Sequence, residues 1–161
     1  MATTATKISR EEIIESNKLI AKFMGAKYIY HPDYVSTKHW FKFPERKSEV
    51  RDNELRYHSS WDSLMPVVEK IEMSPVKRTE YIGGNSDYCN LKTIWSSLSK
   101  ECYAKFQSET DDKIFSSASS ENKIEAVWEA VIEFIKWYNI QQAFDEATKR
   151  YGKTLENLGN E

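Results

Sequence analysis

The stretch "YCNLKTIWSSLSKECYAKF" (88–106) contains two runs in which apolar and polar side chains alternate. Alternation with a period of two residues is typical of β-strands that bury one face. We therefore predict one strand over 88–95 and a second over 101–106. The residues expected to share a face are Cys89, Leu91, Thr93 and Trp95 in the first strand, and Cys102, Ala104 and Phe106 in the second.

A further strand is predicted upstream, over "VKRTEYI" (76–82), and the turn "GGNSD" (83–87) follows it. Glycine supplies the left-handed backbone positions that a hairpin turn requires. Adjacent strands without strict helix alternation favour an antiparallel sheet covered by helices. The fold class that we expect is α+β, an antiparallel sheet of three to five strands packed with helices. The expected order is α-β-(β)-α-β-β-β-α, followed by a C-terminal helix.

Three helices flank these strands. Ser9 and Glu12 form a capping-box pattern that starts the first, and Gly25 is a natural stop for it. The second lies in "LRYHSSWDSLMPVVEKIE" (55–72), where Ser59 and Ser60 can cap it and Trp61 is expected in the core. The third runs from about residue 120 to 139 with helical spacing of its apolar side chains. Its apolar positions are Ile124, Val127, Trp128, Val131, Ile135 and Tyr138, and its solvated stripe is Glu125, Glu129, Glu133 and Lys136.

The remaining segments carry weaker patterns, and we expect 1–161 to form a single domain. Residues 1–8 are predicted to be frayed, and "KYIYHPD" (27–33) to contain a short strand. The segment 33–54 is interpreted as an insertion loop that includes a strand at 39–43, and 107–122 as a polar loop. The tail 141–161 is predicted to be a separate, more polar helix that packs late or serves a partner.

Charge and composition narrow the class of protein. The formal net charge of the 161-residue chain is -2 and its pI is near 6.0, so no global field attracts nucleic acid. The two cysteines give neither a disulfide framework nor a Cys-x-x-Cys metal motif. The leading "MATTATKISREE" has no apolar signal-peptide core, and no apolar run has the length of a membrane span. We expect a cytoplasmic protein that does not contact membranes.

Two groups of residues were candidates for catalysis or metal binding. His58 and Asp62 lie four residues apart, but a metal site needs three or four ligands, and helix capping explains the same segment. Asp33 with Glu45 and Lys47 resembles the arrangement of metal-dependent nucleases, but a proline directly precedes Glu45 and the surroundings are predicted to be loop. We therefore predict no catalytic residue, no cofactor and no metal, and a protein that is not an enzyme. His58 is left without a structural role.

The strongest candidate for a recognition surface is the basic and aromatic segment 38–51. Cations that meet phosphates and rings that stack on bases are the combination that single-stranded nucleic acids favour. The other interpretation is that the rings enter the core. Trp137 lies off the main apolar stripe and is a candidate anchor for a protein partner, because tryptophan supplies large contact areas at interface centres. The candidate partner-binding residues are Lys38, Trp40, Lys42, Arg46, Lys47, Arg51 and Trp137.

Three fragments resemble a known group of proteins: "NKLIAKFMGAKY" (17–28), "RYHSSWDSLMPVVEKIE" (56–72) and "SKECYAKF…SSENKIEAVWEAVIEFIKWYN" (99–139). They are similar to small hypothetical proteins of phages and prophages in Bacteroidetes-type bacteria, and more distantly to the phage ABA sandwich domain. The resemblance covers most of residues 17–139 and brings no catalytic motif. The chain departs from it at 29–54 and after residue 139.

This resemblance implies an accessory protein of a mobile element, and such proteins commonly bind and disable a host machine. We expect a non-enzymatic phage or prophage protein that inhibits a host defence component, such as an anti-CRISPR acting on an effector. Its partner would be a host protein or ribonucleoprotein, contacted through 33–54 and the C-terminal tail. The alternative is a module that binds RNA or single-stranded nucleic acid through the 38–51 segment.

Overall fold

A computed structural model describes residues 8–31, 39–77, 86–96, 100–108 and 113–158, and it confirms the expected α+β class. The helices are α1 (Arg10–Phe23), α2 (Trp61–Glu72) and α3 (Lys123–Leu158), with a short 3-10 turn η1 (Asp52–Glu54). The strands are β1 (Lys27–Ile29), β2 (Trp40–Lys42), β3 (Val50–Arg51), β4 (Val76–Lys77), β5 (Ser86–Asp87), β6 (Cys89–Ser96), β7 (Glu101–Ser108) and β8 (Ile114–Ser120). All of the strand pairings are antiparallel.

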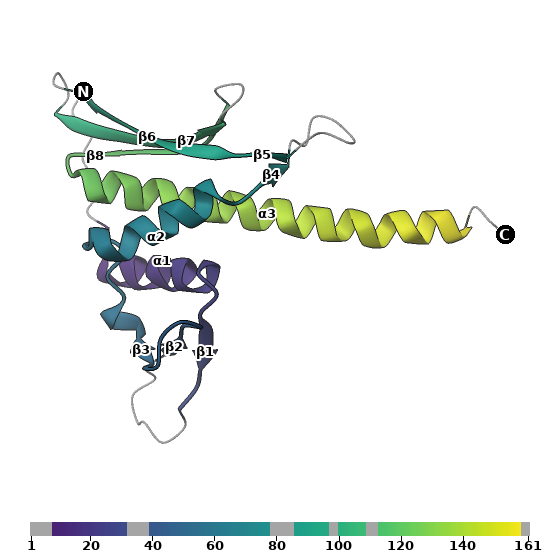
Figure 1. Ribbon diagram of the computed structural model, residues 1–161, viewed down its shortest axis with the longest axis horizontal. Coiled ribbons are helices and arrows are strands. Elements are labelled where there is room, and N and C mark those ends of the chain that lie inside the picture. Colours follow the sequence, from purple (N-terminus) through teal and green to yellow (C-terminus); the bar gives the residue numbers. More distant parts are fainter. Residues whose placement is uncertain (1–7, 32–38, 78–85, 97–99, 109–112, 159–161) are drawn as a thin grey trace.

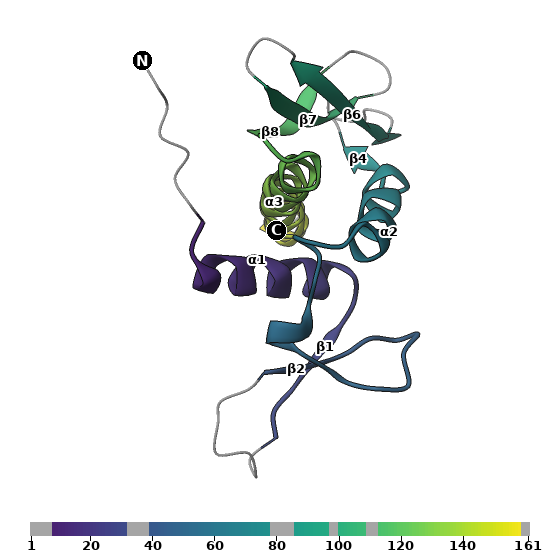
Figure 2. The same ribbon diagram turned by 90° about the vertical axis from the view of Figure 1, so that its left-hand side faces the viewer.

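α3 is the central element of the body. The β6–β7–β8 sheet packs on its first half through β7 and β8, and α2 lies beside it and contacts β6. α1 packs against α3 as well, and the β1–β2–β3 sheet lies beyond α1 (Figure 1 and Figure 2). The second half of α3 extends well past the rest of the body (Figure 1).

The register of the larger sheet explains which face enters the core. Leu91 of β6 pairs with Phe106 of β7, which in turn pairs with Ser116 of β8. This register confirms the prediction that alternate residues of β6 lie on one face and that alternate residues of β7 do so too. On that face Cys89, Cys102 and Phe106 are buried. Phe106 packs against Phe134 of α3, with ring centroids 5.4 Å apart. Burial fades along β6, where Leu91 is half-buried and Thr93 is exposed.

Helix boundaries follow the capping rules only in part. The capping box of α1 is confirmed, since Glu12 N donates to Ser9 Oγ at 3.2 Å and Ser9 N donates to the Glu12 carboxylate at 2.8 Å. Gly25 follows α1 with φ of 86°, a conformation that glycine adopts without strain. The capping predicted for α2 is wrong in its detail, because Ser60 is the N-cap but its side chain makes no capping bond. Trp61 is also not in the core, since 38 % of it is exposed.

Three loop or tail predictions need correction. The "polar loop" 107–122 contains β8, where the small side chains of Ser116 and Ala118 let α3 approach closely. In the 33–54 insertion the strand expected at 39–43 is confirmed as β2, whereas β3 and η1 were not expected, because a strand of two residues is too short to show an alternating pattern. The tail 141–161 is not a separate helix, since α3 continues unbroken to Leu158.

Other boundaries fall partly outside the described part of the chain. β4 and β5 pair as expected for a hairpin, but the tip of the "GGNSD" turn and most of the predicted strand 76–82 lie outside the described residues. So do residues 1–7, whereas Ile8 packs against the core. No helix in the described ranges is long and apolar enough to cross a membrane.

Candidate functional site

The β1–β2–β3 sheet gathers cations around one tryptophan. In its register Lys27 lies opposite Lys42, Ile29 opposite Trp40, and Trp40 opposite Arg51. Side chains directly opposite each other in a sheet project from the same face. The face made by Lys27, Ile29, Trp40, Lys42 and Arg51, which we call the basic face, is therefore the one turned away from the core. The opposite face carries Phe41, which is only 1 % exposed and belongs to the core.

Trp40 is held in place by its neighbours on the basic face. The Arg51 guanidinium lies over its indole ring, 5.0 Å from the centroid, in a cation–π contact. The His31 ring meets it edge-on at 5.6 Å, and His31 Nε2 lies 2.8 Å from a carboxylate oxygen of Glu49. Arg51 also pairs with Glu54, with 3.8 Å between Nε and the carboxylate. The indole is thus ordered before any partner binds.

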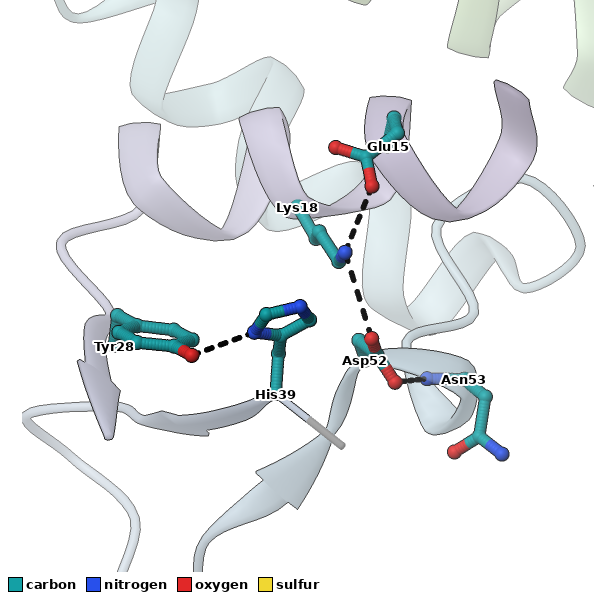
Figure 3. Close-up of polar contacts among 6 residues, drawn as sticks. All are labelled: Glu15, Lys18, Tyr28, His39, Asp52 and Asn53. Carbon is teal, nitrogen blue, oxygen red and sulfur yellow. Dashed lines mark hydrogen bonds and ion pairs between the residues drawn. The ribbon is translucent and has the colours of Figure 1, made fainter. Parts of the chain in front are cut away.

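A polar junction fixes the small sheet to α1 (Figure 3). Lys18 Nζ pairs with Glu15 at 2.8 Å and with Asp52 of η1 at 3.5 Å, and the second carboxylate oxygen of Asp52 accepts from Asn53 N at 2.8 Å. The hydrogen bond from Lys18 lowers the pKa of Glu15. Within the sheet the Tyr28 hydroxyl bonds His39 Nδ1 at 2.6 Å. The Lys18–Asp52 pair is thus the contact of this junction that joins the small sheet to α1.

Three of the seven predicted partner-binding residues share one face in the structure. Trp40, Lys42 and Arg51 share the basic face. Lys47 lies in the β2–β3 turn, where its carbonyl accepts a hydrogen bond from Lys42 Nζ. Lys38 lies outside the described residues. The remaining two residues, Arg46 and Trp137, do not lie on the basic face.

Arg46 lies over the Phe43 ring at 5.2 Å and lines a cavity of about 240 Å³ between the β2–β3 turn and the start of α2. Tyr57 lines the same cavity, and burial raises its pKa to about 12, so that its hydroxyl stays neutral. Trp137 lies on α3 and packs on Phe115 at 5.0 Å and Phe134 at 5.6 Å. Trp137 is half-buried in this aromatic cluster. It therefore lies on α3 and not on the sheet that carries the basic face.

His58, the residue without a sequence-based role, belongs to a buried polar cluster. Asn17 Nδ2 donates to the Leu55 carbonyl at 2.8 Å and lies 3.0 Å from His58 Nδ1, while Asn17 Oδ1 accepts from Trp128 Nε1 at 3.0 Å. Asn17 is 1 % exposed, and its side chain joins α1, the turn before α2, and α3. Burial lowers the pKa of His58, which favours the neutral ring that accepts at Nδ1. Its role in this cluster is structural.

Within the described ranges, no group of three or more His, Cys, Asp or Glu side chains is placed to hold a metal ion. Cys89 and Cys102 are free and buried, and Cys89 Sγ donates to the Ile71 carbonyl at 3.7 Å. Asp33, one carboxylate of the nuclease-like pattern, lies outside the described residues.

Sequence patterns missed Lys27, His31 and Glu49 as members of this site. Each lies apart from the aromatic run of β2 in the sequence. The His31 ring meets Trp40 and Glu49 bonds His31, whereas Lys27 is placed on the same face as Trp40 by its pairing with Lys42, so only the three-dimensional structure identifies them. Comparison with protein-family models, with curated proteins and with solved structures found no match. The resemblance of the three fragments to phage and prophage proteins therefore stays a hypothesis.

Proposed function

We propose that this chain is a non-enzymatic phage or prophage accessory protein that binds and inhibits a host defence component, such as a CRISPR effector. The observation that supports a binding role is the basic face, where Lys27 and Lys42 share a side of the sheet with Trp40 and the Arg51 guanidinium lies over the Trp40 ring. Tryptophan and arginine are the residues most enriched at the energetic centres of protein interfaces. Surrounding cations suit an acidic protein surface and would speed its association.

The same geometry argues against the alternative, a platform for RNA or single-stranded nucleic acid. Base stacking needs open aromatic faces, and the three rings of the segment are covered on at least one side. Phe41 is buried, Phe43 lies under Arg46, and Trp40 lies under Arg51. The cations can still bind phosphates, but the rings that would stack on bases already pack against other side chains of this protein.

The test is affinity capture from host lysate with the wild-type chain and with a Lys27→Glu/Lys42→Glu/Arg51→Glu variant. A matched control reverses three cations outside the small sheet, Lys100, Lys105 and Lys123. We expect the wild type and the control to retain the same host protein, and the basic-face variant to lose it. Retention that survives nuclease treatment supports a protein partner. Capture that disappears with nuclease, together with steep salt dependence, would support the nucleic-acid alternative.

The inhibitory role needs a separate measurement in cells. Expression of the wild-type chain in a host with an active defence system is expected to raise phage plating, and the basic-face variant should not. Equal plating with and without the wild-type chain, across hosts whose defences are known to act on that phage, would contradict inhibition. Capture and plating together distinguish a binding protein from an inhibitor.

A further inference from the structure

The second half of α3 exposes an apolar stripe. Ile140, Phe144 and Tyr151 are 65 %, 63 % and 72 % exposed, and Ala147 lies between them with spacings of four, three and four residues. This spacing places all four side chains on one face of the helix. No residue of α3 beyond Ile135 is buried among those whose side chains are described. A long helical segment without tertiary packing is marginally stable in water, so this extension lacks the contact that would normally stabilise it.

The apolar face of α3 changes sides near residue 140. In the body, Val127, Val131 and Ile135 face the core, and the opposite stripe carries Glu129, Glu133 and Lys136. Ile140 lies seven residues after Glu133 and four after Lys136, so the exposed apolar stripe continues the charged stripe of the body rather than its buried face. The positions that continue the buried face are polar: Gln142, Asp145, Glu146 and Lys149. The extension therefore turns its apolar side away from this chain's own core.

We propose that the extension of α3 pairs with the same extension of a second copy of this chain, in an antiparallel homodimer. The stripe formed by Ile140, Phe144, Ala147 and Tyr151, which we call the seam, would be the contact. An antiparallel helix pair related by a twofold axis uses the same patch on both copies.

Charge does not oppose a second copy. The positions beside the seam are small or uncharged except for Arg150, so closing it removes few charges from water. Lys149 lies on the opposite side of the helix and is not part of the contact.

Area and shape set the strength of the contact. A phenylalanine or tyrosine side chain carries roughly 150–250 Å², so the seams of two copies together offer on the order of 800 Å² of apolar surface. Stable complexes bury at least about 1,200 Å², and the flanking side chains supply part of the difference. The expected dimer is therefore weak and concentration-dependent. A parallel pair would also force the two wide bodies together at one end of a thin helix (Figure 1), and an antiparallel pair separates them.

The test is sedimentation of the full chain over a concentration series from about 1 µM to several hundred µM. We expect a monomer–dimer equilibrium for the wild type, and a dissociation constant raised at least about a hundredfold by Phe144→Glu with Tyr151→Glu, because two apolar anchors are lost on each copy. Met73→Glu alters another exposed apolar side chain, 76 % exposed at the end of α2, and should leave the equilibrium unchanged.

Orientation is measured by placing a spin label at Lys123→Cys, since both native cysteines are buried. With a rise of 1.5 Å per residue, an antiparallel pair centred on the seam sets the two labels roughly 60 Å apart, and a parallel pair sets them within about 20 Å. A wild type that stays monomeric at every concentration overturns the proposal. So does a dimer that the seam variant leaves intact, or a short label-to-label distance.

Discussion

At the scale of single residues, Asn17 has the most consequential position in the body. Its buried amide bonds three segments that are far apart in sequence: the Leu55 carbonyl, the His58 ring and the Trp128 indole. A buried polar group that loses its partner costs about 1–3 kcal/mol. Asn17→Leu would leave the Leu55 carbonyl, the His58 ring and the Trp128 indole without this hydrogen-bond partner. We expect it to lower the free energy of unfolding several times more than Asn53→Ala does, since Asn53 is exposed. Urea unfolding measures both.

His58 gives this cluster a dependence on pH. Burial lowers its pKa below the ordinary value of 6.5, so the unfolded chain takes up the proton more readily than the folded one. The stability contributed by neutral His58 is therefore complete above pH 6.5 and is lost as the pH falls through the folded-state pKa. Between about pH 5 and pH 8, urea unfolding of His58→Gln should show a flatter dependence on pH than the wild type. Identical pH profiles for the two proteins would contradict this role.

At the scale of elements, β8 shows how a strand can be present without an obvious apolar pattern. Its inward face carries Ser116, Ala118 and Ser120, and Ser116 Oγ donates to the Ala130 carbonyl of α3 at 2.8 Å. Small side chains let the helix backbone come close, which a face of large apolar residues would prevent. The serine-rich composition that suggested a loop is thus what the close packing of strand and helix requires.

A pair of neighbouring substitutions tests this account of β8. Ser116 is 7 % exposed and Ser117, the next residue, faces outward and is exposed. Ser116→Leu should destabilise the protein by about 1–3 kcal/mol through overpacking, in addition to the lost hydrogen bond. Ser117→Leu should change stability by no more than about 0.5 kcal/mol. Thermal and urea unfolding provide the comparison, and equal losses for the two variants would show that β8 does not press on α3 as described.

Prediction from sequence succeeded where local patterns matched the packing. Alternation in 88–106 identified the inward faces of β6 and β7, and the capping box with Gly25 marked both ends of α1. It failed where the deciding contact was distant. The strands β1 and β2 were predicted, but their pairing with β3 was not, since β3 has only two residues. The unbroken α3 combines two helical stretches whose apolar faces point in opposite directions. The candidate site shares this limit, because Lys27 is placed on the same face as Trp40 only by the register of β1 and β2.

At the scale of the whole molecule, the body and the extension of α3 have different physical roles. Among the side chains that the structure describes, every buried one lies at or before Ile135, and the half-buried Trp137 and Tyr138 complete the aromatic cluster of the body. The extension adds exposed helix and the seam. The small sheet that carries the basic face lies beyond α1, on another side of the body from the extension (Figure 1 and Figure 2). Host binding at the basic face and self-association through the extension can therefore occur in the same molecule.

A truncation after Asn139 separates these roles. At low micromolar concentration, where the wild type is expected to be monomeric, the free energy of unfolding of the truncated chain should differ from that of the wild type by less than about 1 kcal/mol, since none of the removed side chains that the structure describes is buried. At several hundred micromolar the two should diverge. Dimer formation stabilises the folded wild type by mass action, so its melting temperature should rise with concentration while that of the truncated chain stays constant. A truncated chain that melts far earlier at low concentration would show that the extension supports the body, because a free monomer then depends on contacts that α3 makes beyond Tyr138.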